Sequence, residues 1–267
     1  TLLLIDQTAL VQALGLTLVH SLWQGALLLA VLLLVWPKLR SARIRYLLAY
    51  TTLCSITLLA ASTFVWVFEP ANSVANQAPE PGYLPSFLPA IEASPVLKTT
   101  TFSPEPWYPL LVGLWVVGLV FFLLKLGGGM LYLGRMRRTA LVVGDNSWQR
   151  RVDELAQQLS LSRPVLLLES ALVHTPLTLG FLKPLILMPV GLINQLSASE
   201  VEAILAHELA HIARRDWLFN LFQAFMETLF YYHPAVWWLS DRIRAERENC
   251  CDDVAVALSG NPLMYAK

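Results

Sequence analysis

The sequence has few charged residues and no excess of either sign. Only 14% of its 267 residues are charged, and 19 Lys and Arg balance 19 Asp and Glu. An average soluble domain carries about 25% charged residues, so the composition excludes an ordinary soluble surface. The lack of a basic excess argues against a direct nucleic-acid partner. The hydrophobic fraction of 56% argues against disorder.

Cysteine is also scarce, and the three cysteines cannot form a disulfide framework. Cys54 lies inside a hydrophobic run. Cys250 and Cys251 are adjacent and lack the spaced pairs that are typical of structural zinc sites. We therefore expect all three to be small buried residues on helices.

Charge is missing altogether from long stretches of the first half of the chain. A hydrocarbon core of about 30 Å requires about 20 apolar residues in a helix. Residues 8–36, 46–68 and 107–134 are long enough, and Lys125 in the third can reach the interface with its long side chain. We predict an α-helical membrane protein with three transmembrane helices in residues 1–138.

The connecting segments predict the orientation of these helices. Basic residues gather between the first two stretches (Lys38, Arg40, Arg43, Arg45) and after the third (Arg135, Arg137, Arg138). By the positive-inside rule, both segments are cytoplasmic. Residues 69–106 hold eight of the sixteen prolines, which predicts an irregular extracytoplasmic loop.

Residues 139–267 have the composition of a small cytoplasmic α+β domain. Apolar residues recur at helical spacing over 148–160, and 165–168 is a short apolar run typical of a strand. Residues 176–180 and 185–188 predict a strand pair with a turn at 180–184. The prolines at 176, 184 and 189 confine these strands to edges or ends, and an open edge can accept an extended peptide as a further strand.

A metal-binding motif follows on a predicted helix. Ser197 and Glu200 fit a capping box, which places the helix start at this point. His207 and His211, four residues apart, lie on one helical face and can reach one metal ion, while Glu208 can act on a metal-bound water. Neutral imidazoles suit zinc, which lowers the pKa of bound water and polarises a carbonyl.

Such a site requires a third protein ligand, and the predicted helix at 238–253 offers several carboxylates. Arg244, Glu248 and Asp252 share one face of it. Glu248 is the better candidate ligand, with Asp252 as the outer carboxylate that orients a ligating group. Glu246 points elsewhere and is the lesser candidate. The default interpretation of each carboxylate is a solvent-exposed residue paired with Arg. Only the third ligand that the two histidines require favours Glu248 as a metal ligand.

Residues 217–240 are nearly uncharged and by hydropathy alone would predict a fourth span. A fourth span would separate the two histidines from Glu248 by a bilayer, so one ion could not bind all three. We therefore predict a helix that packs on the domain or dips into the membrane and turns back near His233 and Pro234. This arrangement holds the active site at the cytoplasmic membrane face.

Taken together, these motifs resemble the BlaR/MecR family of membrane-bound zinc metallopeptidases. The motifs are His207-Glu-Leu-Ala-His211 with Arg215-Asp216 and Asn220, Tyr232-His233-Pro234 with Trp237, Arg247-Glu248 with Cys251-Asp252, Pro176-x-x-x-Gly180 and Pro184-x-x-x-x-Pro189. They cover about residues 140–267, and the three upstream spans match the membrane topology of the family.

The resemblance implies a gluzincin-type fold in the bacterial plasma (inner) membrane, with zinc on His207, His211 and Glu248 and with Glu208 as general base. In antibiotic-sensing members, an extracytoplasmic penicillin-binding sensor drives cleavage of a cytoplasmic repressor. The present sequence does not contain that sensor, so a repressor is only one alternative for the protein or peptide substrate. The Ste24/HtpX group of quality-control proteases, which shares the motif and the later Glu-x-x-x-Asp, is another.

We expect hydrolysis of peptide bonds in a signalling role, with membrane lipid as a second partner. An additional donor to the oxyanion is expected, and His233, Tyr231 and Arg244 are the candidates among which the sequence does not choose. A receptor or scaffold with a non-catalytic zinc site is the rival from another class, although such a site does not need Glu208. Substrate, activating signal and oligomeric state are left open.

Overall fold

The computed structural model describes residues 7–75, 106–144, 146–180 and 183–259. The chain divides into two compact units, one of residues 1–28 and 54–118 and the other of residues 29–53 and 119–267. Three long helices contribute to both units: α1 (Gln7–Val35), α2 (Ala42–Ala75) and α3 (Tyr108–Thr139). The prediction of separate domains at 1–138 and 139–267 stays a prediction.

The three long helices are apolar enough to cross a membrane, as the sequence predicts. The segments that qualify are Ala9–Lys38, Ala42–Phe68 and Tyr108–Thr139. Large apolar side chains point outward from them, including Leu34, Trp66 and Leu131, which are 75%, 77% and 78% exposed. In a bilayer such side chains contact lipid. The predicted proline-rich loop lies almost wholly outside the described residues.

In the first unit, close contacts join the long helices. Gln24 on α1 donates to the hydroxyl of Thr63 on α2 over 3.0 Å. Gly15 on α1 lies against the ring of Tyr108 on α3, where an added Cβ would stand 2.9 Å from ring atoms. Small residues and polar pairs of this kind are typical of helix packing in membranes.

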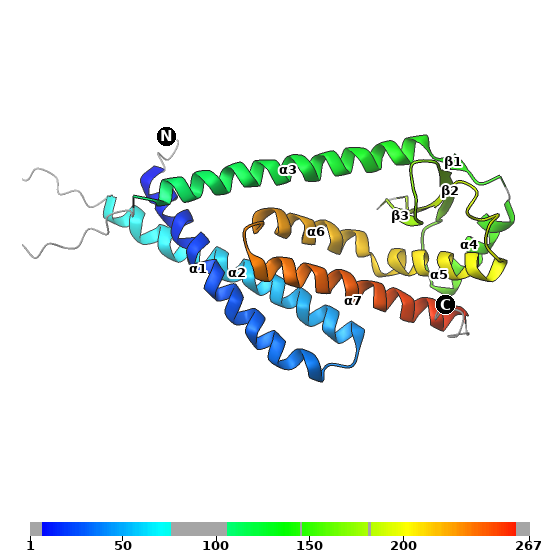
Figure 1. Ribbon diagram of the computed structural model, residues 1–267, viewed down its shortest axis with the longest axis horizontal. Helices are drawn as coiled ribbons and strands as arrows, with labels where there is room; N and C mark the ends of the chain where they lie inside the picture. Colours follow the sequence, from blue (N-terminus) through cyan, green and yellow to red (C-terminus); the bar gives the residue numbers. More distant parts are fainter. Residues whose placement is uncertain (1–6, 76–105, 145, 181–182, 260–267) are drawn as a thin grey trace, which may run out of the picture. The chain divides into compact units, whose positions relative to one another are not determined.

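The second unit contains a four-stranded sheet with the order β1-β2-β4-β3 (Figure 1). The strands are β1 (Leu141–Val142), β2 (Leu166–Ser170), β3 (Leu177–Leu179) and β4 (Leu185–Pro189). β4 pairs parallel with β2 and antiparallel with β3, which confirms the predicted strand pair. Pro184 and Pro189 stand at the ends of β4, and β3 is an edge strand. The predicted turn contains residues 181 and 182, which lie outside the described residues.

β4 is apolar along its whole length because both of its faces are buried. Ile186 and Met188 pack in the core formed with α4 (Asn146–Gln158) and α5 (Ala198–Arg214). Leu185 and Leu187 pack on the opposite face with Met136, near the end of α3. The sheet therefore supports α5 from one side and meets α3 on the other.

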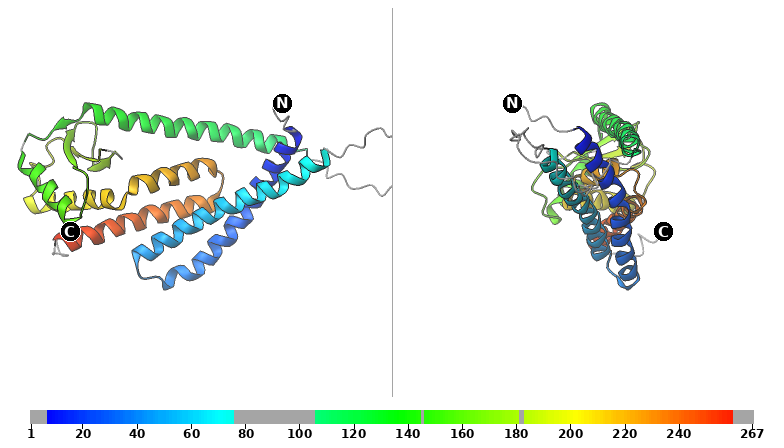
Figure 2. Two further views of the ribbon diagram at one scale, coloured as in Figure 1. Left: turned by 180° about the vertical axis from the view of Figure 1, so that it is seen from behind. Right: turned by 90° about the vertical axis from the view of Figure 1, so that its left-hand side faces the viewer.

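Helices α5, α6 (Asp216–Leu229) and α7 (Pro234–Ser259) follow the sheet. Ser197 caps α5 with the predicted capping box. The left-handed conformation of Arg215 (φ 58°) ends α5, and α6 begins at the next residue. After a turn at His233 and Pro234, α7 runs back along α6 and then along α5, as Figure 1 and the reverse view in Figure 2 show.

This turn confirms the predicted reversal of the chain. α6 has 14 residues, about 21 Å of helix at 1.5 Å per residue, which is too short to cross a hydrocarbon core of about 30 Å. The second half of α7 consequently lies beside α5 rather than across a bilayer from it. α7 contains the predicted helix of residues 238–253 and ends at Ser259.

Candidate metal centre

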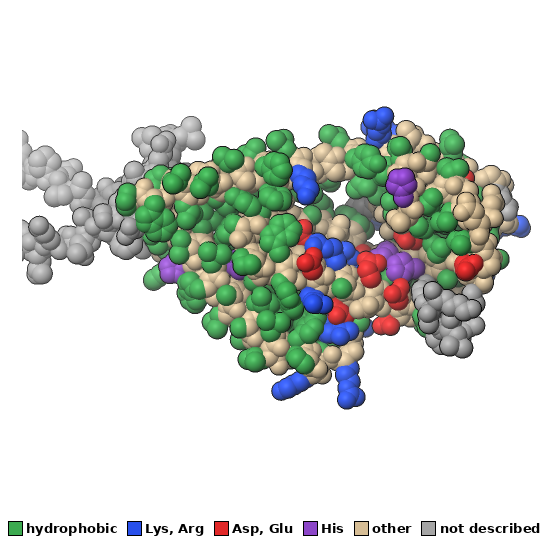
Figure 3. Space-filling model, viewed as in Figure 1, with side chains coloured by type: hydrophobic (Ala, Val, Ile, Leu, Met, Phe, Trp, Pro, Cys, Tyr) green, Lys and Arg blue, Asp and Glu red, His purple; other side chains and the backbone are tan. Residues whose placement is uncertain are grey.

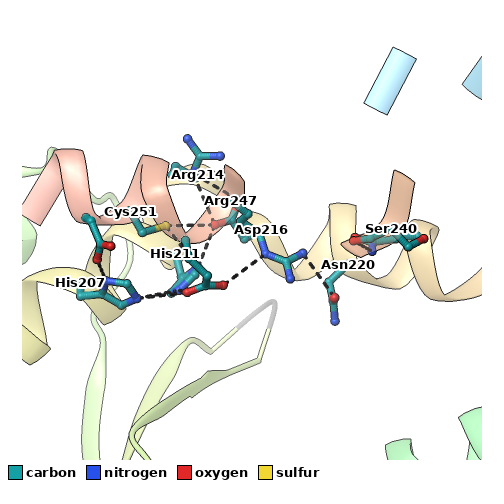
Figure 4. Close-up of polar contacts among 11 residues, drawn as sticks. His207, His211, Arg214, Asp216, Asn220, Ser240, Arg247 and Cys251 are labelled. Atoms are coloured by element: carbon teal, nitrogen blue, oxygen red, sulfur yellow. Dashed lines mark hydrogen bonds and ion pairs between the residues drawn. The ribbon is translucent and has the colours of Figure 1, made fainter. Parts of the chain in front are cut away.

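Three side chains from α5 and α7 converge on one point. The Nε2 atoms of His207 and His211 lie 3.2 Å apart. Glu248 Oε2 lies 3.4 Å from each of them. Figure 4 shows the two imidazole rings turned toward one another from successive turns of α5, with α7 alongside. The structure thus brings together the two histidines and Glu248, the carboxylate preferred as the third ligand.

The triangle formed by these three atoms fits a zinc ion. Four ligands at about 2.0–2.1 Å from zinc in tetrahedral geometry lie about 3.3 Å from one another. The observed separations of 3.2–3.4 Å match that edge length. Three protein ligands leave a fourth position for water or substrate, as in catalytic zinc sites.

The outer nitrogen of each imidazole contacts a carboxylate. His207 Nδ1 lies 2.8 Å from Asp252 Oδ1 on α7, and His211 Nδ1 lies 2.8 Å from Asp216 Oδ2 at the start of α6. With a proton on each Nδ1, both Nε2 lone pairs face the centre of the triangle. Such outer carboxylates orient the ring and raise its basicity as a ligand.

Residue spacing does not predict the contact of Asp216 with His211. Five residues beyond His211, Asp216 would lie off the ligand face of a continuous helix. The left-handed Arg215 interrupts the helix and returns the Asp216 carboxylate toward His211. Nothing in the local sequence spacing predicts this break, because αL residues other than Gly are uncommon.

Cys251 also contacts this group. As expected, it is a buried residue on a helix, and its Sγ lies 3.3 Å from His211 Nδ1 and 3.4 Å from Asp216 Oδ2. Burial raises the pKa of the thiol. A second metal ion among His211, Asp216 and Cys251 is disfavoured, because Nδ1 and Oδ2 at 2.8 Å are closer together than the about 3.3 Å that separates ligands of a tetrahedral zinc ion. Asp216 and Cys251 instead contact His211 Nδ1 and orient the imidazole ring.

When no metal is bound, the three central groups compete for protons. Hydrogen bonding to Glu248 raises the pKa of His207. Burial lowers the pKa of His211, but its hydrogen bonds to Asp216, Cys251 and Glu248 outweigh burial and raise it to about 12. The same two imidazoles hold the pKa of Glu248 well below its usual range.

We therefore expect the zinc affinity to fall as the pH is lowered. Raised pKa values keep protons on the imidazoles below neutral pH, and these protons must leave before a metal binds, whereas Glu248 stays ionised and adds no proton. Between pH 7 and pH 5, the apparent affinity should fall by about tenfold to a hundredfold per pH unit, one factor of ten for each proton released. Competition with a chromophoric chelator at each pH measures it. An affinity independent of pH would contradict the ligand set.

The metal centre faces a cavity of about 1070 Å³. Its walls come from β3, α5, α6, α7 and the part of α3 from Phe122 to Leu133. Glu208 lies in the wall with the three proposed ligands and is 7% exposed, and burial raises the pKa of its carboxyl. Figure 3 shows acidic and histidine side chains gathered over α5, α6 and α7.

The three candidate oxyanion donors each make contacts with neighbouring helices or turns. His233 is fully buried and caps α7, where its Nδ1 accepts from the amide of Ala235. The ring of Tyr231 stacks on Phe122, and Arg244 forms an ion pair with Glu227. None of the three is among the described residues that line the cavity. Their local hydrogen bonds and packing explain these positions, which sequence spacing does not reveal.

Other polar residues occupy the cavity wall instead. Arg247 is 8% exposed, and its guanidinium lies 3.8 Å from Glu248 and donates to Asn220 Oδ1 over 3.4 Å (Figure 4). Both Arg247 and Asn220 line the cavity. Glu246, the lesser candidate ligand, points away and forms a 3.0 Å ion pair with Arg45.

Comparison with known proteins identifies relatives that share part of the chain. The regulatory protein BlaR1 of Bacillus licheniformis is 29% identical over 138 residues, which is 52% of this chain and 23% of that protein. The methicillin resistance mecR1 protein of Staphylococcus aureus is 26% identical over 83 residues, which is 31% of this chain and 14% of that protein. The chain thus matches less than a quarter of the length of these curated relatives.

A family model extends the similarity over almost all of the sequence. The model described as BlaR1 peptidase M56 matches residues 14–266. This range includes the long apolar helices, the sheet and the three helices that carry the metal centre. The family description agrees with the resemblance that the sequence motifs indicate. The chain belongs to the BlaR1 peptidase M56 family.

Proposed function

We propose that the chain is a zinc-dependent endopeptidase of a bacterial membrane. One observation carries the proposal: three ligand atoms with the separations of a tetrahedral zinc site share a cavity with a buried glutamate. His207, His211 and Glu248 would hold the ion. Glu208, beside them in the cavity wall, would be the general base.

The residues of the chain divide the work of peptide hydrolysis. A bound zinc ion supplies Lewis-acid activation of water and of the scissile carbonyl. Glu208 accepts the proton of the attacking water and passes it to the leaving amine, and its raised pKa suits both transfers. Asn220 and Arg247 are polar donors in the cavity wall that could stabilise negative charge on the carbonyl oxygen.

The substrate would bind as an extended segment along β3. Strand β3 is at the edge of the sheet, and residues 176–180 line the cavity that contains the metal centre. An edge strand offers free backbone groups to an added strand, which aligns a peptide without reading most of its sequence. Gly180 follows this strand with a left-handed φ of 91°. A side chain does not fit at this position, because a Cβ added to Gly180 would meet Lys183 O at 2.5 Å.

We further propose the arrangement that the sequence predicts: a gluzincin-like domain of residues 139–267 with its active site at the cytoplasmic membrane face. Because the relatives are named a regulatory protein and a methicillin resistance protein, we infer a role in signal transduction by cleavage of a cytoplasmic regulator. Quality control of the Ste24/HtpX type is the alternative protease function. The buried Glu208 disfavours a zinc-stabilised scaffold, which has no need of a base.

Hydrolysis that depends on the metal tests the proposal. The full chain in lipid nanodiscs, loaded with zinc, should cleave fluorescein-labelled casein. The chelator 1,10-phenanthroline should abolish the cleavage, and added zinc should restore it. Cleavage that survives removal of the metal would contradict the metal mechanism. A zinc-loaded chain that cleaves nothing would favour the scaffold.

A further inference from the structure

The first turn of membrane helix α2 packs against the helices of the metal centre. Tyr46 is 6% exposed, and its ring lies edge-on to Phe219 of α6, with centroids 6.4 Å apart. Its neighbour Arg45 forms a 3.0 Å ion pair with the buried Glu246 of α7. One turn further along α2, Tyr50 packs on Phe219 with a centroid distance of 5.3 Å. All these residues belong to the second compact unit.

Arg214 links this helix end to a proposed zinc ligand. Its guanidinium lies 5.3 Å from the centroid of the Tyr46 ring, in a cation–π contact. Its Nε lies 3.4 Å from both carboxylate oxygens of Asp216. Asp216 in turn lies 2.8 Å from His211 Nδ1. Side chains from α2, α5 and α6 therefore form one continuous series of contacts that ends at the metal centre.

The orientation of Asp216 depends on Arg214. Asp216 is 5% exposed, and one of its oxygens, Oδ2, is shared by His211, Cys251 and Arg214. The other, Oδ1, is buried and makes no hydrogen bond within the part of the chain that the structure describes. The positive charge of Arg214, whose Nε lies 3.4 Å away, compensates the charge of Oδ1. A buried carboxylate oxygen is costly without such a partner, so movement of Arg214 would reorient the carboxylate.

We propose that Tyr46 is a positioning residue for the metal centre, which it affects through Arg214, Asp216 and the orientation of His211. The position of membrane helix α2 would then set the catalytic rate. The rate effect rests on the proposed function, whereas the effect on the metal site does not. Outer partners of a metal-bound imidazole commonly change affinity or activity by about tenfold to a hundredfold.

The chain offers matched variants on the same helix. Tyr46→Leu removes the ring beneath Arg214, and Tyr46→Phe keeps it. Tyr50→Leu is the control, because its ring packs on Phe219, Phe222 and Tyr46 and its hydroxyl donates to Phe219 O, whereas the cation–π contact with Arg214 is made by the ring of Tyr46. Both leucine variants remove a tyrosine that packs on α6, so a general loss of packing would affect them alike.

The test uses the full chain in lipid nanodiscs loaded with cobalt(II), whose visible absorption reports the ligand geometry of the site. Tyr46→Leu should bind the same amount of cobalt with an altered spectrum. With zinc, it should lower kcat on labelled casein by about tenfold without a change in KM. Tyr46→Phe should restore both, and Tyr50→Leu should resemble the wild type. Combining Tyr46→Leu with Arg214→Gln should add nothing to the effect of Arg214→Gln alone.

Two outcomes would overturn the proposal: a Tyr46→Leu spectrum that is unchanged, or one that changes no more than that of Tyr50→Leu. If Tyr46→Leu does not fold, Arg214→Gln with Arg214→Lys as its conservative partner decides the same question by the same spectrum. Failure of the proposed function is distinguishable, because the wild type would then bind cobalt and cleave no casein. The spectra would still test the effect of Tyr46 on the metal centre.

Discussion

Replacing Glu208 with Gln should leave the metal in place and nearly abolish peptide hydrolysis. The amide has almost the shape of the carboxylate but cannot accept the proton of water at neutral pH. Glu208 lies in the cavity wall, outside the triangle of the three proposed ligands, so the substitution removes no ligand atom. General acid–base catalysis contributes about 10²- to 10⁴-fold, and kcat on labelled casein should fall by that factor.

The appropriate control is Glu202→Gln, six residues earlier on the same helix. Glu202 is an ion-pair partner of Arg151 on α4 and is not among the described residues that line the cavity. This variant should match the wild type in zinc content and rate. If Glu208→Gln cleaves as fast as the wild type, Glu208 is not the base and the proposed mechanism fails.

Glu248→Ala should release the metal. The substitution removes one corner of the triangle and leaves two imidazoles, whose Nε2 atoms at 3.2 Å cannot complete a zinc site alone. Since loss of an outer partner already costs about tenfold to a hundredfold in affinity, loss of a direct ligand should cost at least about a hundredfold. Zinc content after dialysis, measured by atomic absorption, should fall well below that of the wild type, and hydrolysis should fall with it.

Glu246→Gln discriminates between the two carboxylates that the sequence offers as third ligand. Glu246 points toward Arg45, away from the metal centre, so this variant should retain zinc. An amide can still accept a hydrogen bond from Arg45, which limits the loss of packing. Unchanged zinc content in Glu248→Ala, or zinc loss in Glu246→Gln, would assign the third ligand elsewhere.

Features that depend on residues close together in the sequence could be predicted from the sequence. The three long apolar helices need only enough consecutive apolar residues, and the structure confirms them with small changes, such as a start at Ala42 and an end at Thr139. The capping box of α5 and the pairing of β3 with β4 also depend on neighbouring residues. The spacing of His207 and His211 guarantees a shared helical face.

The reversal at His233 and Pro234 was predicted by a different argument. Hydropathy alone favours a span over residues 217–240, whereas the need to bring Glu248 to the histidines requires the chain to turn back. The structure agrees with the second argument, since α6 is short and α7 runs back beside it. A chemical requirement was therefore a better guide than hydropathy at this point of the chain.

Residue patterns alone predict the membrane helices, the helix that carries the two histidines and the family. Which distant groups meet these elements depends on the tertiary structure. It brings the expected Glu248 and Asp252 to the metal centre, turns Asp216 toward His211, and leaves His233, Tyr231 and Arg244 out of the described cavity lining. The physical reason is that a helical period fixes neighbours within one element, whereas contacts between elements depend on chain reversals and side-chain packing, which local spacing does not encode.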